Sequence, residues 1–354
     1  MKILDRYIGR MVSSAVFTVM GILVTVFSFF KFIDELDELG QGRYGLIQAA
    51  EFVGLSIPRL TYELFPVGAL IGSLVGFGTL VSNSELVVIR GAGVSLGRIV
   101  IAVLKVGLLI MAVAVILGEW IAPPTDQLAQ HRRSVATTDQ IALKTRNGFW
   151  ARDGRSYVNI RKILPGDRVE EIYIYEFDKG NRLKVSTYAK RAGYIEGQWL
   201  LEDLERTIFK PDRISQQHIE RARWGSLLNP KLIHLIVIKP NNLSIQDLHR
   251  YIHFLKINNQ NSLQYEQALW FKITYPLATG VMVFLAIPIV LGTLNKATIG
   301  QRVVLGSCIG LVFHIFNKAA GQLGLVLDLN PALSVTFPTV LALLIALVLM
   351  RKVA

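Results

Sequence analysis

Six long apolar stretches constrain the fold of this chain more than any other feature of its sequence. A bilayer core about 30 Å thick is crossed by ~20 helical residues, and a helix satisfies its own backbone hydrogen bonds, as every segment in hydrocarbon must. The stretches cover residues 11–30, 64–81, 99–120, 273–294, 303–326 and 331–350. The sequence therefore predicts six transmembrane helices.

The composition indicates that a soluble part accompanies these helices. Hydrophobic residues make up 52% of the 354 residues, more than in ordinary soluble domains, yet 18% are charged. The first apolar stretch is too long for a signal peptide and has no small-residue cleavage site, so we interpret it as an uncleaved span. The single cysteine, Cys308, excludes an intramolecular disulfide and indicates no thiol metal site.

The charges of the short loops predict which side of the membrane each loop faces, because lysine and arginine are enriched in short cytoplasmic loops. If the N-terminus is cytoplasmic, that side holds Lys2, Arg6, Arg10, Arg90, Arg98, Lys296, Arg302, Arg351 and Lys352. The short loops of the other side hold the acids Asp34, Glu35, Asp37, Glu38 and Asp328. We therefore expect both termini and residues 82–98 in the cytoplasm, and residues 123–269 outside it.

Residues 123–269 have a different sequence pattern: short runs in which apolar and polar residues alternate, bounded by glycine, aspartate and asparagine. Such runs favour a sandwich or jelly-roll-like sheet, and they lie at 157–160, 172–175, 183–188 and 198–202. Ser244 and Asp247 are spaced as the cap of an amphipathic helix that leads toward the fourth span. Residues 125–269 hold 23 basic and 16 acidic residues, so more than half of the net charge of +12 is outside, which argues against a nucleic-acid partner.

The predicted fold class is a membrane α-helical protein of six transmembrane helices with an inserted, exported β-jelly-roll-like domain. Residues 1–122 would form spans one to three, residues 123–269 the exported domain ending in a helix, and residues 270–354 spans four to six. The polar loop at 82–98 is expected to hold a short helix, capped by Ser82 or Ser84, with Glu85 near its positive end. This helix is either an interfacial anchor or a surface on which another protein acts.

Ionisable residues at membrane depth are candidate ligand contacts, since a charge in hydrocarbon costs about 2.5 kcal/mol or more. Lys31, Arg59 and Arg133 are expected near the outer interface, where they either snorkel to the headgroups or grip an anionic amphipathic ligand. Lys318 lies deeper, one helical turn from His314. It either contacts such a ligand or forms a buried ion pair with Glu63 or Glu119.

Two common enzyme motifs, one for nucleotide binding and one for metal binding, are absent from the sequence. It lacks the phosphate-binding loop G-x-x-x-x-G-K-[ST] and the metal motif H-E-x-x-H. His249 and His253 are four residues apart on a predicted helix, and we interpret them as a solvated face rather than as metal ligands. We expect a subunit without cofactor or metal that is not itself an enzyme.

Short motifs spread over essentially the whole chain match a known family. They begin at Leu4 (L-D-R-Y-I-G), Phe65 (F-P-V-G-A-L-I-G), Ser84 (S-E-L-V-V-I-R-G-A-G), Gly118 (G-E-W-I-A-P), Gly148 (G-F-W-A-R-D-G), Leu243 (L-S-I-x-x-L) and Gly300 (G-Q-R-V-V). Together they resemble the LptF/LptG family, the permeases of the lipopolysaccharide export ABC transporter, and within it the G type.

This resemblance implies a complex in the bacterial inner membrane. The expected partners are a cytoplasmic ATPase dimer (LptB-like), which would bind the ATP and Mg²⁺, a second permease (LptF-like) and periplasmic bridge proteins (LptC-like and LptA-like). Lipopolysaccharide would enter from the outer leaflet of the membrane, between the first and fifth spans of opposing permeases. It would then pass through the periplasmic jelly-roll domains to the bridge.

The resemblance also implies residue roles. The loop helix would dock in a groove of the ATPase, with the coupling residues Glu85, Leu86, Arg90, Gly91 and Gly93. Together with the charges at membrane depth, it makes the candidate lipopolysaccharide-binding residues Lys31, Arg59, Phe65, Pro66, Arg133, His314 and Lys318. Phe65 and Pro66 match an apolar cavity wall and are expected to kink or loosen the second span. Arg302 matches a base associated with function, but its expected place on the inner side favours anchoring.

Two other functions are kept as alternatives. An ion-coupled secondary transporter would use Lys318, His314 and Glu63 as a proton relay, and discontinuous helices or inverted repeats would favour it. A membrane-anchored periplasmic scaffold would bind a partner and transport nothing. It would leave the charged rim and the Glu85 helix unexplained.

Overall fold

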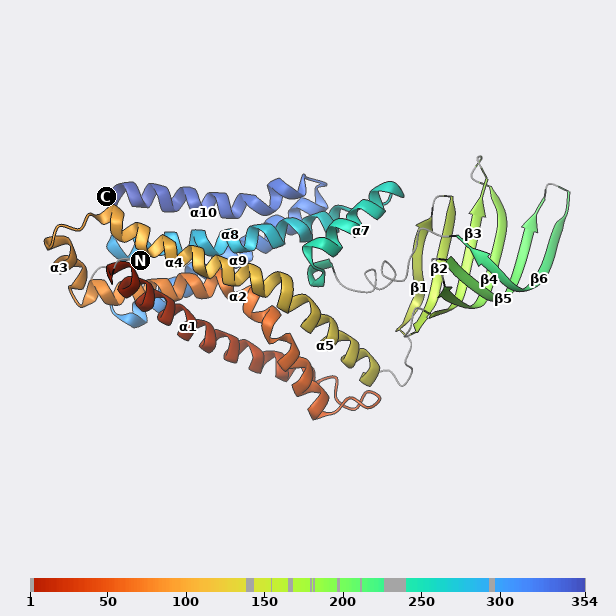
Figure 1. The fold of residues 1–354 in the computed structure, drawn as a ribbon, viewed down its shortest axis with the longest axis horizontal. Helices are drawn as coiled ribbons and strands as arrows, with labels where there is room; N and C mark the ends of the chain where they lie inside the picture. The colour runs from red at the N-terminus through yellow and green to blue at the C-terminus, as the bar shows by residue number, and fades with distance from the viewer. Residues whose placement is uncertain are drawn as a thin grey trace.

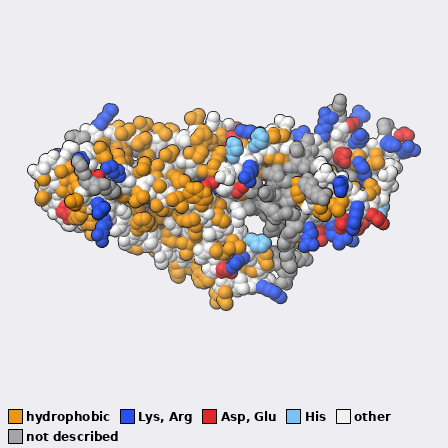
Figure 2. Space-filling view, in the orientation of Figure 1, with side chains coloured by type: hydrophobic (Ala, Val, Ile, Leu, Met, Phe, Trp, Pro, Cys, Tyr) orange, Lys and Arg blue, Asp and Glu red, His pale blue; other side chains and the backbone are white. Residues whose placement is uncertain are grey.

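The computed structural model describes residues 3–137, 143–153, 155–164, 168–178, 180, 182–195, 198–210, 212–225, 240–292 and 297–353. The molecule is elongated, with a helical bundle at one end and a β-sheet at the other (Figure 1). Both chain termini lie at the end of the bundle far from the sheet, which we call the loop end (Figure 1). Apolar side chains cover the bundle between its two ends, and charged side chains gather at the loop end and over the sheet (Figure 2).

Within the described residues, six helices are long and apolar enough to cross a membrane, as the sequence predicts. They are α1 (Ile3–Leu36), α2 (Leu46–Ser82), the continuous α4–η1–α5 (Leu96–Ile116, Leu117–Ile121 and Ala122–Thr137), α8 (Leu263–Leu291), α9 (Ile299–Val326) and α10 (Pro331–Val353). The first three extend well beyond their apolar stretches. Helix α5 and the first turns of α2 pack on each other there, through Ala129 and Phe52.

Helix α2 is at the centre of the bundle. In its most apolar window 78% of the residues are buried, against 11% in α1 and 17% in α9. Helix α1 approaches α2 closely because Gly76 has no side chain: a Cβ atom there would lie 2.9 Å from Cβ of Ala15 and 3.0 Å from the carbonyl oxygen of Met11. Because so few residues of α1 and α9 are buried, both helices keep broad apolar faces free for lipid or for another membrane protein.

The inserted segment contains an antiparallel sheet, which confirms a helical membrane protein with a β domain. Its strands are β1 (Leu143–Asp153), β2 (Ser156–Leu164), β3 (Arg168–Phe177), β4 (Leu183–Ile195), β5 (Gln198–Phe209) and β6 (Ile214–Trp224). Each strand pairs with the next one along the chain, so the sheet order is the chain order. The four runs predicted from alternation lie within β2, β3, β4 and β5. In β3, alternate residues such as Ile172 and Ile174 are buried at 1% and 2% exposure.

The helical bundle continues past residue 123, where the sequence predicts the start of the exported domain. Helix α5 runs to Thr137, and the first described strand begins at Leu143. Pro123 lies directly after the π-helical segment η1, inside the continuous helix, and it has no N–H to donate to the preceding turn. Asp126 and Ala129 are buried at 1% and 0% exposure. The polar sequence of α5 concealed this packing.

The return from the sheet to the bundle passes through η2 (Pro240–Asn242) and α7 (Ile245–Ile257). As predicted, Ser244 caps α7: its hydroxyl oxygen accepts from the backbone N–H of Asp247 at 3.1 Å. The apolar face of α7, which includes Leu248, Ile252 and Leu255, is buried.

Candidate functional site

The short helix α3 (Glu85–Gly91) lies at the loop end, between α2 and α4 (Figure 1). Leu86 is 5% exposed and packs in the bundle core, whereas Val87 and Val88 are 69% and 70% exposed. Leu86 therefore anchors the helix, and its exposed apolar surface is the valine pair. The helical period could have found this, because Leu86 and Ile89 share one face and the valines lie off it.

The structure confirms the predicted end of α3 but not its predicted cap. Gly93 has a φ of +84°, and its N–H donates to the carbonyl of Arg90 at 2.9 Å, while the N–H of Val94 donates to Ile89 at 3.3 Å. This pair of bonds is a Schellman motif, which glycine favours. Ser84 is left-handed, with a φ of 59°, and its hydroxyl makes no cap bond. Its backbone carbonyl accepts from the first turn instead.

Arg302 ties the start of α9 to the end of α2, directly before α3. Its side chain is fully buried, and Nη2 donates to Oγ of Ser82 at 2.7 Å. Gly78 makes room for it, because a Cβ atom there would lie 2.6 Å from Cδ and Cζ of the arginine. Arg302 thus lies at the loop end and holds α9 against α2, which is the place where the predicted anchoring would operate.

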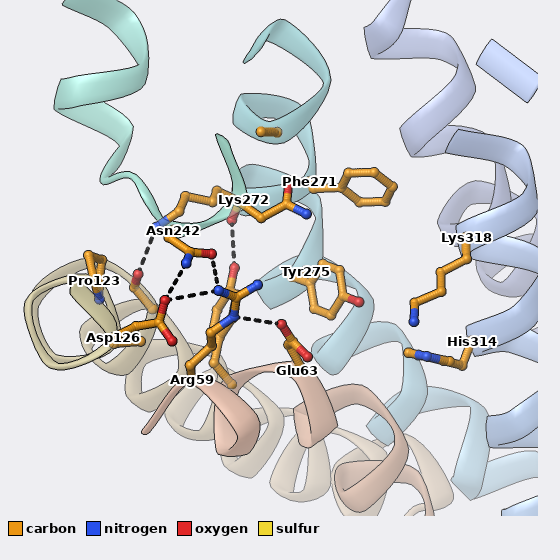
Figure 3. Close-up of a pocket in the computed structure, with 15 residues that line it drawn as sticks. Arg59, Glu63, Pro123, Asp126, Asn242, Phe271, Lys272, Tyr275, His314 and Lys318 are labelled. Carbon is orange, nitrogen blue, oxygen red and sulfur yellow. Dashed lines mark hydrogen bonds and ion pairs between the residues drawn. The ribbon is translucent and has the colours of Figure 1, made fainter. Parts of the chain in front are cut away.

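A cavity of ≈ 340 Å³, which we call the polar cavity, lies nearer the sheet, where α2, α5, α8, α9 and the turns η1 and η2 meet. Figure 3 shows Lys318 and His314 of α9 on one side of it, facing Tyr275 of α8 and Glu63 of α2. Tyr62 adds a second aromatic wall, stacked on Tyr275 at 5.5 Å between ring centroids. The cavity combines aromatic walls with both cationic and acidic side chains, and Lys318 is the lysine in it that forms no ion pair with a described residue.

Arg59 lines the opposite wall, and groups of the protein itself bind its guanidinium. Nε donates to Glu63 and Nη1 to Asp126, each at 3.0 Å, and Nη1 also donates to the side-chain oxygen of Asn242 (Figure 3). Asp126, which is 1% exposed, accepts a further hydrogen bond from Asn242. A ligand would therefore compete with three protein acceptors for Arg59. The role of Arg59 in lipopolysaccharide binding stays a prediction.

Lys272, which the sequence analysis missed, also lines this cavity and is held by groups of the protein, as Arg59 is. Its Nζ donates to the carbonyl of Gly118 at 2.9 Å and lies 3.8 Å from Oε2 of Glu119. Glu119 in turn accepts from the backbone N–H of Ile245 at 2.9 Å, at the start of α7. Among the described residues, Lys318 forms no ion pair with either glutamate that the sequence suggested. The available signal was a lysine directly before the fourth apolar stretch.

Lys31 and Arg133 flank one aromatic ring beyond the polar cavity. Nζ of Lys31 lies 5.0 Å and Cζ of Arg133 5.3 Å from the ring centre of Phe52, within the range of a cation–π contact. Arg133 is also paired with Glu35 at 3.0 Å and Glu38 at 3.1 Å. Within the described part of the chain, Lys31 has no ion pair. Its ammonium group therefore remains available to an external anion.

Glu35 itself is 8% exposed and is held by two donors. Tyr44 Oη donates to it at 2.8 Å and Arg133 Nε at 3.0 Å. Burial, together with the bond to Glu35, raises the pKa of Tyr44 to about 12, so its hydroxyl stays protonated and donates. This network holds Arg133 in place.

Phe65 and Pro66 lie inside the packed bundle. Phe65 is 4% exposed, and α2 passes through Pro66 without a break in its assigned helix. Neither residue lines the polar cavity. In this single chain they are core residues, and their contact with a ligand stays a prediction.

The described residues contain no group of three or more His, Cys, Asp or Glu side chains that could hold a metal ion. His249 and His253 lie exposed on α7, the arrangement expected of a solvated helix face.

The sequence matches the family model of the lipopolysaccharide export system permease LptF/LptG over residues 6–352. The chain belongs to the LptF/LptG family. It is 35% identical over 341 residues to the lipopolysaccharide export system permease protein LptG of Haemophilus influenzae, covering 96% of this chain and 95% of that protein. It is 32% identical over 354 residues to the LptG protein of Escherichia coli K12, covering 99% and 98%. The resemblance to the G type is thereby confirmed.

In this member of the LptF/LptG family, helix α2 connects α3 with the polar cavity. Helix α2 carries Arg59 and Glu63 at the polar cavity and ends at Ser82 beside α3. The 23 residues from Arg59 to Ser82 span about 35 Å at 1.5 Å per residue. One continuous helix therefore joins the segment beside α3 to the polar cavity.

Proposed function

We propose that this chain is the permease subunit of an ATP-driven transporter that extracts lipopolysaccharide from the outer leaflet of the bacterial inner membrane and passes it to a periplasmic bridge. Membership of the LptF/LptG family supports the proposal. The structural observation that carries it is α3, which presents Glu85 beside the exposed pair Val87 and Val88 at the end of a bundle of apolar helices.

Helix α3 would be the docking site of a separate ATPase dimer. The sequence has no phosphate-binding loop, so ATP and Mg²⁺ would bind in that partner, and this subunit would be non-catalytic. An apolar pair next to a carboxylate suits a groove with apolar walls and a basic residue. Because Leu86 is buried beneath this surface, force on α3 would pass into the core of the bundle.

The proposed orientation places α3 and both termini in the cytoplasm and the sheet in the periplasm. The bias of lysine and arginine toward the loop segments at the α3 end supports it. So does the position of both termini at the loop end, far from the sheet (Figure 1).

Lipopolysaccharide would be recognised near the sheet end of the bundle. Its phosphates need cations, and Lys31 and Lys318 form no ion pair with any described residue. Its acyl chains need an apolar wall, which the weakly buried helices α1 and α9 supply, and these helices would face a second permease of the LptF type. The lipid would then be transferred along the sheet to LptC-like and LptA-like bridge proteins.

The alternatives have less support. A proton relay through Glu63, His314 and Lys318 is not favoured by membership of a lipopolysaccharide permease family. Glu63 is paired with Arg59, and α9, which carries the other two, is a continuous helix. A scaffold that moves nothing would leave the charged rim and the exposed valines beside Glu85 on α3 unexplained.

Affinity purification in mild detergent from the native host tests the proposal. We expect the chain to bring down an ATPase and a second six-span protein. A Val88→Asp variant, with a charge on the proposed docking face, should lose the ATPase and keep the other permease. The matched variant Ile214→Asp, at a 68% exposed position on β6, should keep both. Recovery of the wild-type chain alone would contradict the proposed function.

A further inference from the structure

The opening motif L-D-R-Y makes two contacts across the loop end of the bundle, and the site described above does not use them. The hydroxyl of Tyr7 in α1 donates to Oε2 of Glu85 in α3 at 2.7 Å. Two residues earlier, Oδ2 of Asp5 accepts from Nζ of Lys105 in α4 at 2.7 Å. The start of α1 is therefore bonded both to α3 and to α4, the span that follows α3. We call these four residues the α1 clasp.

The two contacts of the clasp differ in burial and so in what they do. Asp5 is 5% exposed, and a buried carboxylate needs a cationic partner, which Lys105 supplies. Tyr7 is 45% exposed, and a hydrogen bond at such a site adds little to the stability of the fold. The bond of Tyr7 to Glu85 instead restricts the orientation of the carboxylate and links it to α1.

Glu85 can bind Tyr7 and a docked protein at the same time. Tyr7 occupies one position on Oε2, and the side chain of Asn83 donates to Oε1 at 3.2 Å. An ionised carboxylate offers about four acceptor positions, so two remain for an incoming arginine or lysine. The clasp therefore need not open when α3 is docked.

The two halves of α1 differ in how they are packed. Its buried residues Ile8, Val12, Val16 and Met20 form a stripe along its first half. Residues 21–34 include no buried position, and Lys31 lies among them. From Tyr7 to Lys31 the continuous helix spans about 36 Å, so it joins the clasp to the unburied half that carries Lys31.

We propose that Tyr7 is a positioning residue that couples displacement of α3 to displacement of the first span, α1. Helix α3 is joined covalently only to the second and third spans, and the Tyr7–Glu85 bond would extend its action to α1, so that ATPase movement shifts Lys31 and the outer half of that helix. This inference rests on the proposed function, because it takes α3 to be the ATPase docking site.

The test uses Tyr7→Phe, which removes one oxygen, in the complete complex with its ATPase and second permease. The complex should assemble and hydrolyse ATP as the wild type does, because Glu85 keeps its carboxylate. Lipopolysaccharide released per ATP hydrolysed should fall about threefold, because the bond that is lost is exposed and therefore weak. Ser14→Ala is the matched control, since it also removes one oxygen from α1, and within the described residues this hydroxyl donates to Met11 of the same helix. It should leave the ratio unchanged.

A distance measurement separates transmission from simple loss of stability. With the exposed Cys308 replaced by serine, spin labels go on Phe29→Cys in α1 and Leu333→Cys in α10, positions that are 62% and 70% exposed. ATP and vanadate should shift this distance in the wild-type complex. The shift should be lost in Tyr7→Phe and kept in Ser14→Ala.

Two outcomes would overturn the inference. One is a Tyr7→Phe complex with wild-type transport per ATP and a wild-type distance shift. The other is loss of the ATPase from that variant, because Tyr7 would then belong to the docking surface itself. Both differ from failure of the proposed function, in which the wild-type chain binds no ATPase at all.

Discussion

Nζ of Lys272 in α8 lies 2.9 Å from the carbonyl oxygen of Gly118, inside the π-helical turn η1 of the third span. A π turn changes the spacing of the helical hydrogen bonds, and such turns are frequent at functional sites. The same lysine lies 3.8 Å from Glu119, which accepts the N–H of Ile245 at the start of α7. One cation therefore connects the fourth span, the third span and the return segment from the sheet.

Replacing Lys272 with methionine should destabilise the chain by about 2–4 kcal/mol, because Glu119 loses its cation and the carbonyl of Gly118 its donor in a buried place. The measurement is the midpoint of thermal unfolding in detergent. Lys256→Met is the control, since its partner Glu266 lies at 2.7 Å but the lysine is 60% exposed. The control should change the midpoint little. Equal effects of the two variants would show that the contact at Gly118 is dispensable.

Arg59 and Asp126 should behave as one unit. In a double-mutant cycle with Arg59→Gln and Asp126→Asn, we expect a coupling energy of about 1–3 kcal/mol, because each variant already removes the same buried contact. Thermal stability of the two single variants and of the double variant measures it. Arg90→Gln, an exposed arginine on α3, paired with Asp126→Asn should be additive. A coupling near zero for Arg59 would leave its guanidinium free for a ligand.

Glu85→Ala should preserve insertion into the membrane and weaken the association with the ATPase at least ~10-fold, because the carboxylate is the only charge beside the two exposed valines in the first turn of α3. Co-purification at increasing salt, followed by transport in reconstituted vesicles, measures the loss. Glu220→Ala, on strand β6, is the control for removal of an acidic residue. Normal association and transport by Glu85→Ala would remove the coupling role.

Lys31→Asp should reduce photocrosslinking to lipopolysaccharide about fivefold, since it replaces an ammonium group that has no ion pair within the described residues by a like charge for the lipid phosphates. Crosslinking by the wild type should also decrease as ionic strength rises. Lys352→Asp, at the loop end, should crosslink normally. If Lys31→Asp does so as well, Lys31 only snorkels toward the headgroups.

Much of the fold could be predicted because its signals are local. Apolar runs of about 20 residues predict spans whatever their neighbours are, and the alternation in 172–175 predicts a strand that buries every second residue. The position of α3 also followed from local pattern, since Gly93 takes a left-handed φ that few other residues accept. The extent of α5 did not, because its polar sequence gives no sign of the α2 surface that covers it.

The sequence by itself determined six spans, an inserted β domain and a short helix within residues 82–98, because burial in lipid and backbone hydrogen bonding act on each segment separately. Only the tertiary structure decided which charged and polar side chains already have partners within the protein. Arg59 meets Asp126 and Asn242, Lys272 meets Gly118, and Tyr7 meets Glu85. These partners are far apart in the chain, and ion pairs and hydrogen bonds depend on distances that only the packing of the helices sets. That packing buries Leu86 and leaves Lys31 available.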